Sequence, residues 1–319
     1  MNPLVSVILP NYNHARFLPQ RIDSILAQTW RAFEFIALDD CSTDESREVL
    51  RSYAARTSMQ LAFNEQNSGS PFRQWQRGLS MASGEYVWLA ESDDVADPRL
   101  LETLLRQFDR YPTAGIAYCQ SYSIDEHGTV SGPLDPWTDP VHPTRWHHDF
   151  FNSGPDEVAN YLIQRNTVPN ASAVLVRRSI LSRAVEHADR MRLSGDWWAW
   201  ARVLLASDVA FVAEPLNFFR SHPRTARDTT KLAIACAEQF EILAHICSQV
   251  HVAPDMRKRV FWMAFEKWLM VLEAQGTPSA DWLWRVHADA RRVFRGATPR
   301  MMWALTKRAL RPHPRPVAS

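Results

Sequence analysis

The segment Gly84–Asp94, GEYVWLAESDD, joins a short apolar run to a cluster of acids. Residues Tyr86–Ala90 are mostly aromatic or aliphatic and follow a glycine, which predicts a buried strand. Glu91, Asp93 and Asp94 then fall at the carboxyl end of that strand, the edge at which open α/β sheets bind ligands. Crowded carboxylates repel each other unless a cation lies among them, and Mg²⁺ prefers oxygen ligands. The segment predicts a metal–phosphate site, and the alternative is a solvated acidic turn.

Strands and helices alternate on both sides of this segment. Short apolar runs predict the strands, and apolar residues at helical spacing predict the helices. Such alternation is typical of an α/β fold with a mostly parallel central sheet and helices on both faces. The other predicted strands cover residues 4–9, 33–38, 61–63, 115–122, 172–176 and 209–212, and the helices cover 17–26, 45–56, 72–82, 98–110 and 195–206.

Two regions depart from this alternation. Residues 125–160 are dense in Pro, Trp, His and Asp, and a long irregular segment in a compact domain is more often a functional loop than a linker. From about Thr229 onward the periodicity is helical, and it is broken near Pro254, Pro278 and Pro299. We therefore expect an α/β domain over residues 1–225 that includes an irregular loop, and a helical region over residues 226–319.

Composition narrows the class of protein. The chain has 319 residues, 46% hydrophobic content, 36 basic and 35 acidic residues, and a net charge of +1, which gives no support for nucleic-acid binding. The four cysteines have no zinc-ligand spacing, and we expect them to be reduced. Because we find neither a signal peptide nor a run of about 18 apolar residues, we expect a cytoplasmic protein.

Three predicted strands end in polar groups, and no common phosphate-binding motif accompanies them. The strand ends are Asn11–Asn13, Asp39–Asp40 and Glu91–Asp94. No GxGxxG motif follows the first strand, which argues against a dinucleotide-dependent dehydrogenase, and no GxxxxGK[ST] motif is present. A nucleotide would therefore have to be held by side chains and a metal ion.

Six segments, in order, resemble those of the inverting family-two glycosyltransferases, which have the GT-A fold and include enzymes of bacterial cell-surface polysaccharide synthesis. The resemblance extends from Leu4 to His222 and does not continue beyond about Arg227. The segments are VSVILPNYN, LDDCSTD, NSGSPFRQWQRG, ASGEYVWLAESDD, SGDWWAWARVLL and EPLNFFRSH.

The resemblance implies a nucleotide-sugar site at the strand ends. Pro10 and Tyr12 would form walls of the nucleobase pocket, and Asn13 lies in the same motif. Asp40 would accept a base N–H, which in uracil is N3–H, and its alternative is a turn with a helix cap. Arg73 would face the diphosphate, with a solvated helix charge as its alternative.

The Glu91-Ser-Asp93 segment takes the place of the family's Asp-x-Asp motif. The resemblance implies that Asp93 holds Mg²⁺ or Mn²⁺ and that Glu91 lies near the ribose, although Glu is one methylene longer than the commoner Asp. Asp94 is an alternative metal ligand. His222 would contact the metal or the diphosphate, and its alternative is a structural role. A histidine-rich cluster superficially resembles a zinc site, but its spacing matches no known set of zinc ligands. Its members are His142, His147, His148 and Asp149.

Asp196 matches the family's catalytic base. Inverting transfer needs a carboxylate that deprotonates the acceptor hydroxyl, and one carboxylate within hydrogen-bond reach suffices. The alternative is an ordinary helix N-cap. Trp197 and Trp198 would stack on the acceptor sugar or, alternatively, pack in the core.

The implied function is metal-assisted single displacement from a nucleotide-diphosphate sugar, with a UDP-sugar favoured, to a hydroxyl of a glycan or lipid-linked glycan. One alternative is a carbohydrate-binding or scaffold protein of the same fold without turnover. Another is a sugar-nucleotide pyrophosphorylase, which needs a Gly-rich basic loop after the first strand, where this chain has Pro-Asn-Tyr-Asn.

The end of the chain is basic and amphipathic. Met301, Met302 and Leu305 fall near one face of a predicted helix, with Trp303 among the basic residues. Such a helix can lie in a membrane interface, at the inner face of the cytoplasmic membrane, and the alternative is packing on the preceding helices. The basic residues are Arg291, Arg292, Arg295, Arg300, Lys307, Arg308 and Arg311.

Overall fold

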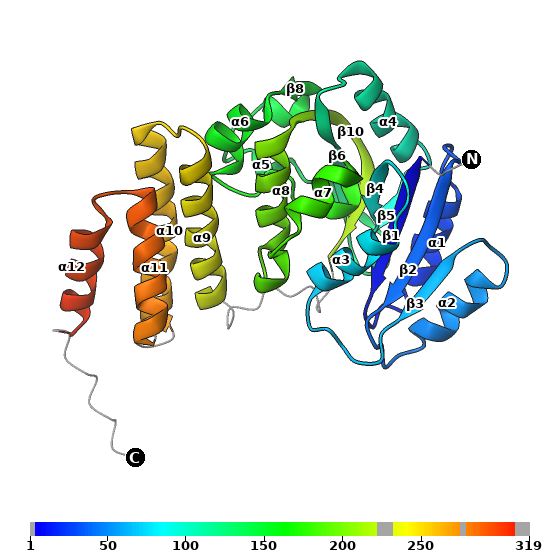
Figure 1. Ribbon diagram of the computed structural model, residues 1–319, viewed down its shortest axis with the longest axis horizontal. Coiled ribbons are helices and arrows are strands. Elements are labelled where there is room, and N and C mark those ends of the chain that lie inside the picture. Colours follow the sequence, from blue (N-terminus) through cyan, green and yellow to red (C-terminus); the bar gives the residue numbers. More distant parts are fainter. Residues whose placement is uncertain (1–3, 222–231, 275–278, 310–319) are drawn as a thin grey trace, which may run out of the picture. The chain divides into compact units, whose positions relative to one another are not determined.

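The computed structural model describes residues 4–221, 232–274 and 279–309 and confirms the α/β fold (Figure 1). Two compact units divide the chain, residues 1–227 and residues 228–319. In the first unit the strands are β1 Val5–Asn11, β2 Phe33–Asp39, β3 Gln60–Phe63, β4 Tyr86–Leu89, β5 Val95–Ala96, β6 Ala114–Ile124, β7 Val130–Pro133, β8 Phe150–Asn152, β9 Val174–Arg177 and β10 Asp208–Arg220. Its helices are α1 Leu18–Leu26, α2 Ser46–Ala54, α3 Pro71–Met81, α4 Leu100–Arg110, α5 Asp135–Thr138, α6 Gly154–Glu157, α7 Arg178–Ala184 and α8 Gly195–Ala206.

The sheet is mixed rather than mostly parallel. Its strand order is β3-β2-β1-β4-β9-β6-β10-β5, with β7 beside β6 and β8 beside β10. The β3-β2-β1-β4 half is parallel, and so is the β6–β10 pair. Strand β9 lies antiparallel between β4 and β6. The alternation of strands and helices predicted parallel crossovers, but β9 enters from the loop after residue 163 and not from a helix packed on the sheet.

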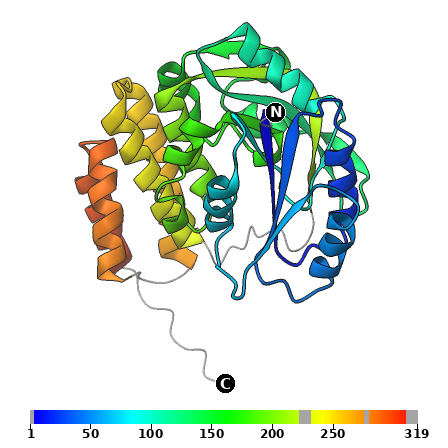
Figure 2. The ribbon, with the colours of Figure 1, turned by 45° about the vertical axis from the view of Figure 1, so that its right-hand side comes forward.

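Helices cover both faces of the sheet of the first unit (Figure 2). Val5, Val7 and Leu9 of β1 belong to one buried cluster with the apolar faces of α1, α2 and α4. Ile8 faces the other side of the sheet and lies against Gly78 of α3. A side chain at position 78 would overlap that of Ile8. Since strand side chains alternate with a period of two, both faces of these strands are apolar, which is why they read as continuous hydrophobic runs.

Residues 125–160 were expected to be irregular, and the structure corrects this. The segment contains β7, α5, β8, α6 and two short helical turns, Arg145–His147 and Val158–Leu162. Trp146 is buried and its indole N–H donates to the Tyr118 hydroxyl at 2.8 Å, which fixes the segment to β6. Elements of three to five residues are too short to produce a hydrophobic period, so the sequence pattern could not show them.

The second unit consists of helices in its described part: α9 Leu232–Gln249, α10 Pro254–Ala274, α11 Ala280–Val293 and α12 Ala297–Ala309. Helix α11 packs against α9, and the Trp282 indole N–H donates to the Ala233 carbonyl at 3.2 Å. Along the described helices, no stretch is both long and apolar enough to cross a membrane. In α12, Met301 and Ala304 are buried whereas Met302 and Trp303 are exposed, so the predicted apolar face is divided. Arg311 and the side chain of Arg308 lie outside the described residues.

The contact between α6 and α8 gives a test of this packing. A Cβ atom at Gly154 would overlap the backbone oxygens of Leu204 and Ser207. Gly154→Ala should therefore lower the free energy of unfolding by about 1–3 kcal/mol, the usual range for overpacking. Urea unfolding followed by circular dichroism measures it. Ser153→Ala is the matched control, because that exposed side chain makes no cap hydrogen bond, and equal midpoints for the two variants would contradict the packing.

Candidate active site

The polar ends of three neighbouring strands meet at one rim of the sheet, as predicted. Asn11 pairs with Asp39 at the ends of β1 and β2. The backbone N–H of Asp40 donates to the Asn11 carbonyl at 2.9 Å, and that of Ala90 donates to Ile8 at 2.7 Å. Since β4 runs parallel to β1 in this register, Glu91 emerges at the same rim as Asn11 and Asp40.

Asp39 holds the turn at this rim. Its buried carboxylate pairs with the Arg47 guanidinium at 2.8 Å and accepts the Asn11 amide at 2.9 Å and the Ser42 N–H at 3.0 Å. Asn13 has a φ of 57°, and its side-chain oxygen accepts the Thr43 N–H at 2.7 Å. These bonds occupy Asp39 and Asn13 in shaping the loop.

Asp40 is buried and accepts hydrogen bonds from α3 and from the loop that precedes it. Its Oδ1 takes the Ser68 N–H and the Gln74 amide, both at 2.9 Å, and also the amide of Asn64. Its Oδ2 takes only the Ser68 hydroxyl, at 2.7 Å, among the bonds that the structure records. Oδ2 accepts fewer donors than Oδ1 and is therefore the oxygen better able to accept a base N–H.

The two predicted wall residues differ in exposure. Tyr12 is 47% exposed and can lie against a planar ring. Pro10 is buried within β1, opposite Leu38 of β2. Of the pair, Tyr12 is thus the side chain that a nucleobase can reach without a change in the strand.

The acidic segment after β4 is crowded and partly buried. Burial raises the pKa of Glu91 to about 8 and that of Asp94 to about 7, and the charge of Asp93 adds to both shifts. The Trp75 indole N–H donates to Glu91 Oε1 at 2.9 Å. Asp94 accepts the backbone N–H of Arg220 at 2.9 Å and is buried, whereas Asp93 is partly exposed. Asp93 is therefore the more accessible carboxylate of the Asp93–Asp94 pair.

Three residues that the sequence reasoning did not single out hold this segment. The Arg21 guanidinium is fully buried 4.8 Å from the Trp88 ring, and its charge favours the ionised carboxylates. Arg220 Nε donates to the Asp93 carbonyl at 2.7 Å. The Ser172 hydroxyl accepts the Glu91 N–H at 3.1 Å and also bonds Asp94. The sequence contained a signal for Arg21, because this charged residue interrupts the apolar face of the helix predicted over residues 17–26.

The donor set suits a hard cation only in part. Carboxylate oxygens at Asp93 and Asp94 are ligands that Mg²⁺ and Mn²⁺ accept. In residues 4–221, 232–274 and 279–309, however, no three His, Cys, Asp or Glu side chains are grouped to hold a metal by themselves. His222 lies outside these residues. A cation here would need phosphate oxygens to complete its coordination, which is how Mg²⁺ commonly binds at such sites.

Asp196 lies in the first turn of α8, two residues after the N-cap Ser194, so it is not the N-cap itself. The Asn166 amide donates to Asp196 Oδ2 at 2.9 Å, and the Trp197 N–H donates to Oδ1 at 2.8 Å. Gly195 allows close approach to the Phe72 ring of α3, because a Cβ there would lie 2.5 Å from it. Helix α8 thus begins against the helix that carries Trp75.

Two aromatic rings connect Asp196 to the acidic segment. Trp75 donates to Glu91, and its ring lies 5.9 Å from that of Trp200. Trp200 follows Asp196 by four residues, so the two share a face of α8. We infer from this chain of contacts that Asp196 faces the same side of the unit as Glu91.

The remaining predicted residues differ in burial and in their partners. Trp197 is only 8% exposed and its indole N–H donates to the Leu162 carbonyl, so its ring belongs to the core alternative. Trp198 is partly exposed and is the acceptor candidate of the pair. Arg73 is half-exposed at the start of α3, 4.0 Å from Asp189. The histidine-rich group is dispersed: His147 faces Asp139 at 3.5 Å, and Asp149 accepts the Ala213 N–H at 2.8 Å.

The sequence is similar to known glycosyltransferases. A family model described as "Glycosyl transferase family 2" matches residues 6–179. Glycosyltransferase GlyG of Streptococcus pneumoniae is 32% identical over 126 residues, which cover 40% of this chain and 42% of GlyG. An uncharacterized glycosyltransferase of a Nostoc species is 28% identical over 253 residues, which cover 74% of this chain and 69% of the relative. The match therefore spans less than half of GlyG but about two thirds of the Nostoc protein.

Solved structures show the same fold. Staphylococcus aureus TarS 1-349 in complex with UDP-GlcNAc has a TM-score of 0.67 at 14% identity, covering 95% of this chain and 87% of that chain. A mannosyltransferase of Pyrobaculum calidifontis, in complex with GDP-Man and Mn²⁺, has a TM-score of 0.56 at 14% identity, covering 97% and 88%. At such low identity these likenesses establish the GT-A fold alone.

The raised pKa of Glu91 predicts a pH-dependent stability. Between pH 4.5 and about 8, Glu91 is protonated in the folded protein but ionised in the unfolded chain. The contribution of this group to the free energy of unfolding therefore falls as the pH rises through that window. Glu91→Gln should therefore gain stability relative to wild type across the window, as measured by urea midpoints at a series of pH values. A stability difference that is independent of pH would contradict the burial of this carboxyl.

Proposed function

Because the chain belongs to glycosyl transferase family 2, we propose that it is an inverting glycosyltransferase. It transfers a sugar from a nucleotide-diphosphate sugar to a hydroxyl of a glycan or lipid-linked glycan by a metal-assisted single displacement. The observation that carries this proposal is the link from Glu91 through Trp75 and Trp200 to the helix face of Asp196. That link supports a donor rim and a base on the same side of the unit.

The donor binds at the rim of the sheet. Tyr12 lies against the base, and Asp40 Oδ2 accepts its N–H. Glu91 lies toward the ribose, and Arg73 faces the diphosphate from the first turn of α3. We favour a UDP-sugar, since uracil N3–H matches a carboxylate acceptor and TarS was solved in complex with UDP-GlcNAc. Because the Pyrobaculum enzyme was solved in complex with GDP-Man, the identity of the base has to be established by direct binding measurements.

A divalent cation would be held by Asp93, with Asp94 behind it. When bound, it neutralises the negative charge that develops on the leaving diphosphate. The chain's own part is to present Asp93 at an accessible position while Arg220 and Ser172 hold the neighbouring backbone and Asp94. Arg73 supplies a further positive charge toward the same oxygens.

Asp196 acts as the general base. Its carboxylate takes the proton of the acceptor hydroxyl, whose oxygen forms a bond to the anomeric carbon on the face opposite the diphosphate. The bond from that carbon to the diphosphate oxygen breaks, and the nucleoside diphosphate leaves with the electron pair. One displacement inverts the anomeric configuration. Asn166 fixes the rotamer of Asp196, which keeps a carboxylate oxygen directed at the acceptor.

The acceptor and the cellular location extend the proposal. The name of TarS assigns it β-N-acetylglucosaminyl transfer to poly(ribitol phosphate), an acceptor that carries hydroxyl groups. We infer a hydroxyl-bearing glycan acceptor here, selected by Trp198 and the segment 125–160, and a cytoplasmic site of action.

Incubating the protein with UDP-sugars and Mn²⁺ and detecting released UDP tests the reaction. Release of pyrophosphate would indicate a pyrophosphorylase, and binding without any release would indicate a scaffold.

Asp196→Asn separates binding from chemistry. The variant should keep the fold and the donor affinity and lose about 10²–10⁴ in transfer rate, the range for loss of a general base. Titration calorimetry with the nucleotide and a transfer assay measure the two quantities. Glu186→Gln, at an exposed carboxylate before α8, is the control and should retain activity. Normal turnover of the Asn variant would remove Asp196 from the mechanism.

Asp93 and Asp94 should have different roles, with Asp93 as the metal ligand and Asp94 as a structural support. Asp93→Ala should keep the melting temperature but lose the Mn²⁺-dependent part of nucleotide affinity, since its carboxylate is the accessible one. Asp94→Ala should lower the stability by about 1–3 kcal/mol, because it leaves the buried Arg220 N–H without an acceptor. Thermal shift with and without Mn²⁺ and UDP measures both. Asp109→Asn, at an exposed carboxylate of α4, should change neither, and an unaltered metal dependence in Asp93→Ala would refute the assignment.

A further inference from the structure

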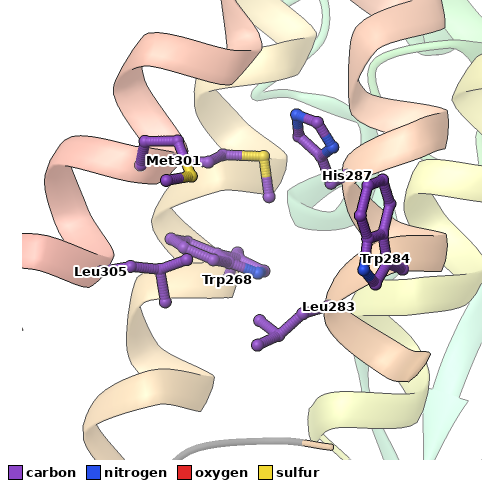
Figure 3. Close-up of a pocket in the computed structure, with 7 residues that line it drawn as sticks. Trp268, Leu283, Trp284, His287, Met301 and Leu305 are labelled. Carbon is purple, nitrogen blue, oxygen red and sulfur yellow. The ribbon is translucent and has the colours of Figure 1, made fainter. Parts of the chain in front are cut away.

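The second unit contains an apolar pocket that the proposed reaction does not use (Figure 3). It lies between α10, α11 and α12 and has a volume of about 260 Å³. Trp268 forms one wall, with Leu283, Met301 and Leu305 around it. Trp268 is fully buried, yet its indole N–H has no hydrogen-bond partner within the described chain. Packing and hydrogen bonding are both incomplete at this place.

The rim of the pocket exposes large apolar side chains. Trp284 is 71% exposed and Met302 57% exposed, and both line the pocket. Trp303, the next residue of α12, is 62% exposed. Single exposed apolar residues are common on soluble proteins, but a group of them around an open pocket marks a contact surface. We refer to Trp284, Met302 and Trp303 as the apolar rim.

Positive charge accompanies this rim. Residues 228–319 contain 14 basic and eight acidic residues, a net charge of +6, whereas residues 1–227 contain 22 basic and 27 acidic residues, a net charge of −5. From residue 290 to residue 319 there is no acidic residue at all, but there are eight basic ones. The overall balance of +1 conceals this asymmetry between the two units.

One cation contacts the rim, and a second lies on the same helix face as Trp284. The Lys307 ammonium is 4.9 Å from the Trp303 ring. Arg291 is exposed and follows Trp284 by seven residues, so it lies on the same face of α11 two turns further on. The neighbouring Arg285 and Arg292 are paired with Asp281 and Asp289 instead. No acidic side chain lines the pocket, so nothing among its lining residues neutralises the two rim cations.

We propose that this surface docks on an anionic lipid bilayer. Trp and Met side chains enter the headgroup region, where amphipathic aromatic rings are favoured, and Arg291 and Lys307 face the anionic headgroups. The open pocket gives an acyl chain a place between α11 and α12. Charge complementarity selects a membrane over an apolar protein partner, because cations accompany the exposed aromatic rings and the acids of α11, Asp281 and Asp289, are paired with arginines. This inference does not depend on the proposed reaction.

Co-sedimentation with vesicles tests it with the full-length protein. The protein should pellet with phosphatidylcholine vesicles that contain phosphatidylglycerol and should be released by high salt, because salt screens the attraction. Vesicles of phosphatidylcholine alone should retain little of it. Arg291→Gln with Lys307→Gln should weaken binding roughly 20- to 30-fold, about fivefold for each cation removed. Trp284→Ser with Trp303→Ser should weaken binding to the anionic vesicles as well.

Matched controls keep the proposal falsifiable. Met270→Ser removes an equally exposed apolar side chain of α10 that lies about 200° around the helix from Trp268, and it should bind vesicles like wild type. Asp196→Asn should also bind like wild type, which separates this surface from the reaction. Equal binding to neutral and anionic vesicles, or unchanged binding of both rim variants, would overturn the proposal. So would a dimer, detected by sedimentation without lipid, that the tryptophan variant dissociates.

Discussion

Burial of the carboxyl groups of Glu91 and Asp94 beside Asp93 is the constraint on which the rim of the first unit depends. Carboxylates taken out of water favour protonation, and here opposite charge and hydrogen bonds offset this only in part, since burial still raises the pKa of Glu91 to about 8 and that of Asp94 to about 7. The buried Arg21 guanidinium supplies positive charge from below the rim, although its own burial lowers its pKa to about 10. At neutral pH it remains charged. All three of its nitrogen atoms lack a hydrogen-bond partner in the described part of the chain, so the field of the acids is what offsets its desolvation.

The mixed sheet follows from the same constraint. The turn Ala171–Ala173 leads into β9 and carries Ser172, whose hydroxyl supports the acidic segment while its carbonyl accepts the Trp88 indole N–H at 2.7 Å. Ser172 can occupy that position because β9 runs antiparallel beside β4 and so begins where β4 ends. A parallel strand would present its other end there. The direction of β9 is thus part of the construction of the site.

The sequence predicted those parts of the site that depend on local pattern. Asp40, Glu91 and Asp93 could be placed at one rim of the sheet because each follows a strand with a clear hydrophobic run, and parallel register brings such ends together. Asn166 and Ser172 could not be found in this way, since they act on residues 30 and 81 positions away. Trp197 was left open because a tryptophan at helical spacing fits the core and a sugar platform equally. The direction of β9 was missed because period alone does not distinguish parallel from antiparallel neighbours.

The position of Arg220 has a consequence for how the chain folds. Its backbone and guanidinium bond Asp94 and Asp93, which lie 126 and 127 residues earlier in the chain. Contacts of such long sequence separation form late, because the entropy of closing the intervening loop is lost before the contacts are gained. The β3-β2-β1-β4 half can assemble from residues 5–89, but the acidic segment has its supports only when β9 and β10 have docked. During synthesis, folding of the sheet can therefore begin at its parallel half, whereas the acidic segment at the rim takes its final form only after residue 220 has left the ribosome.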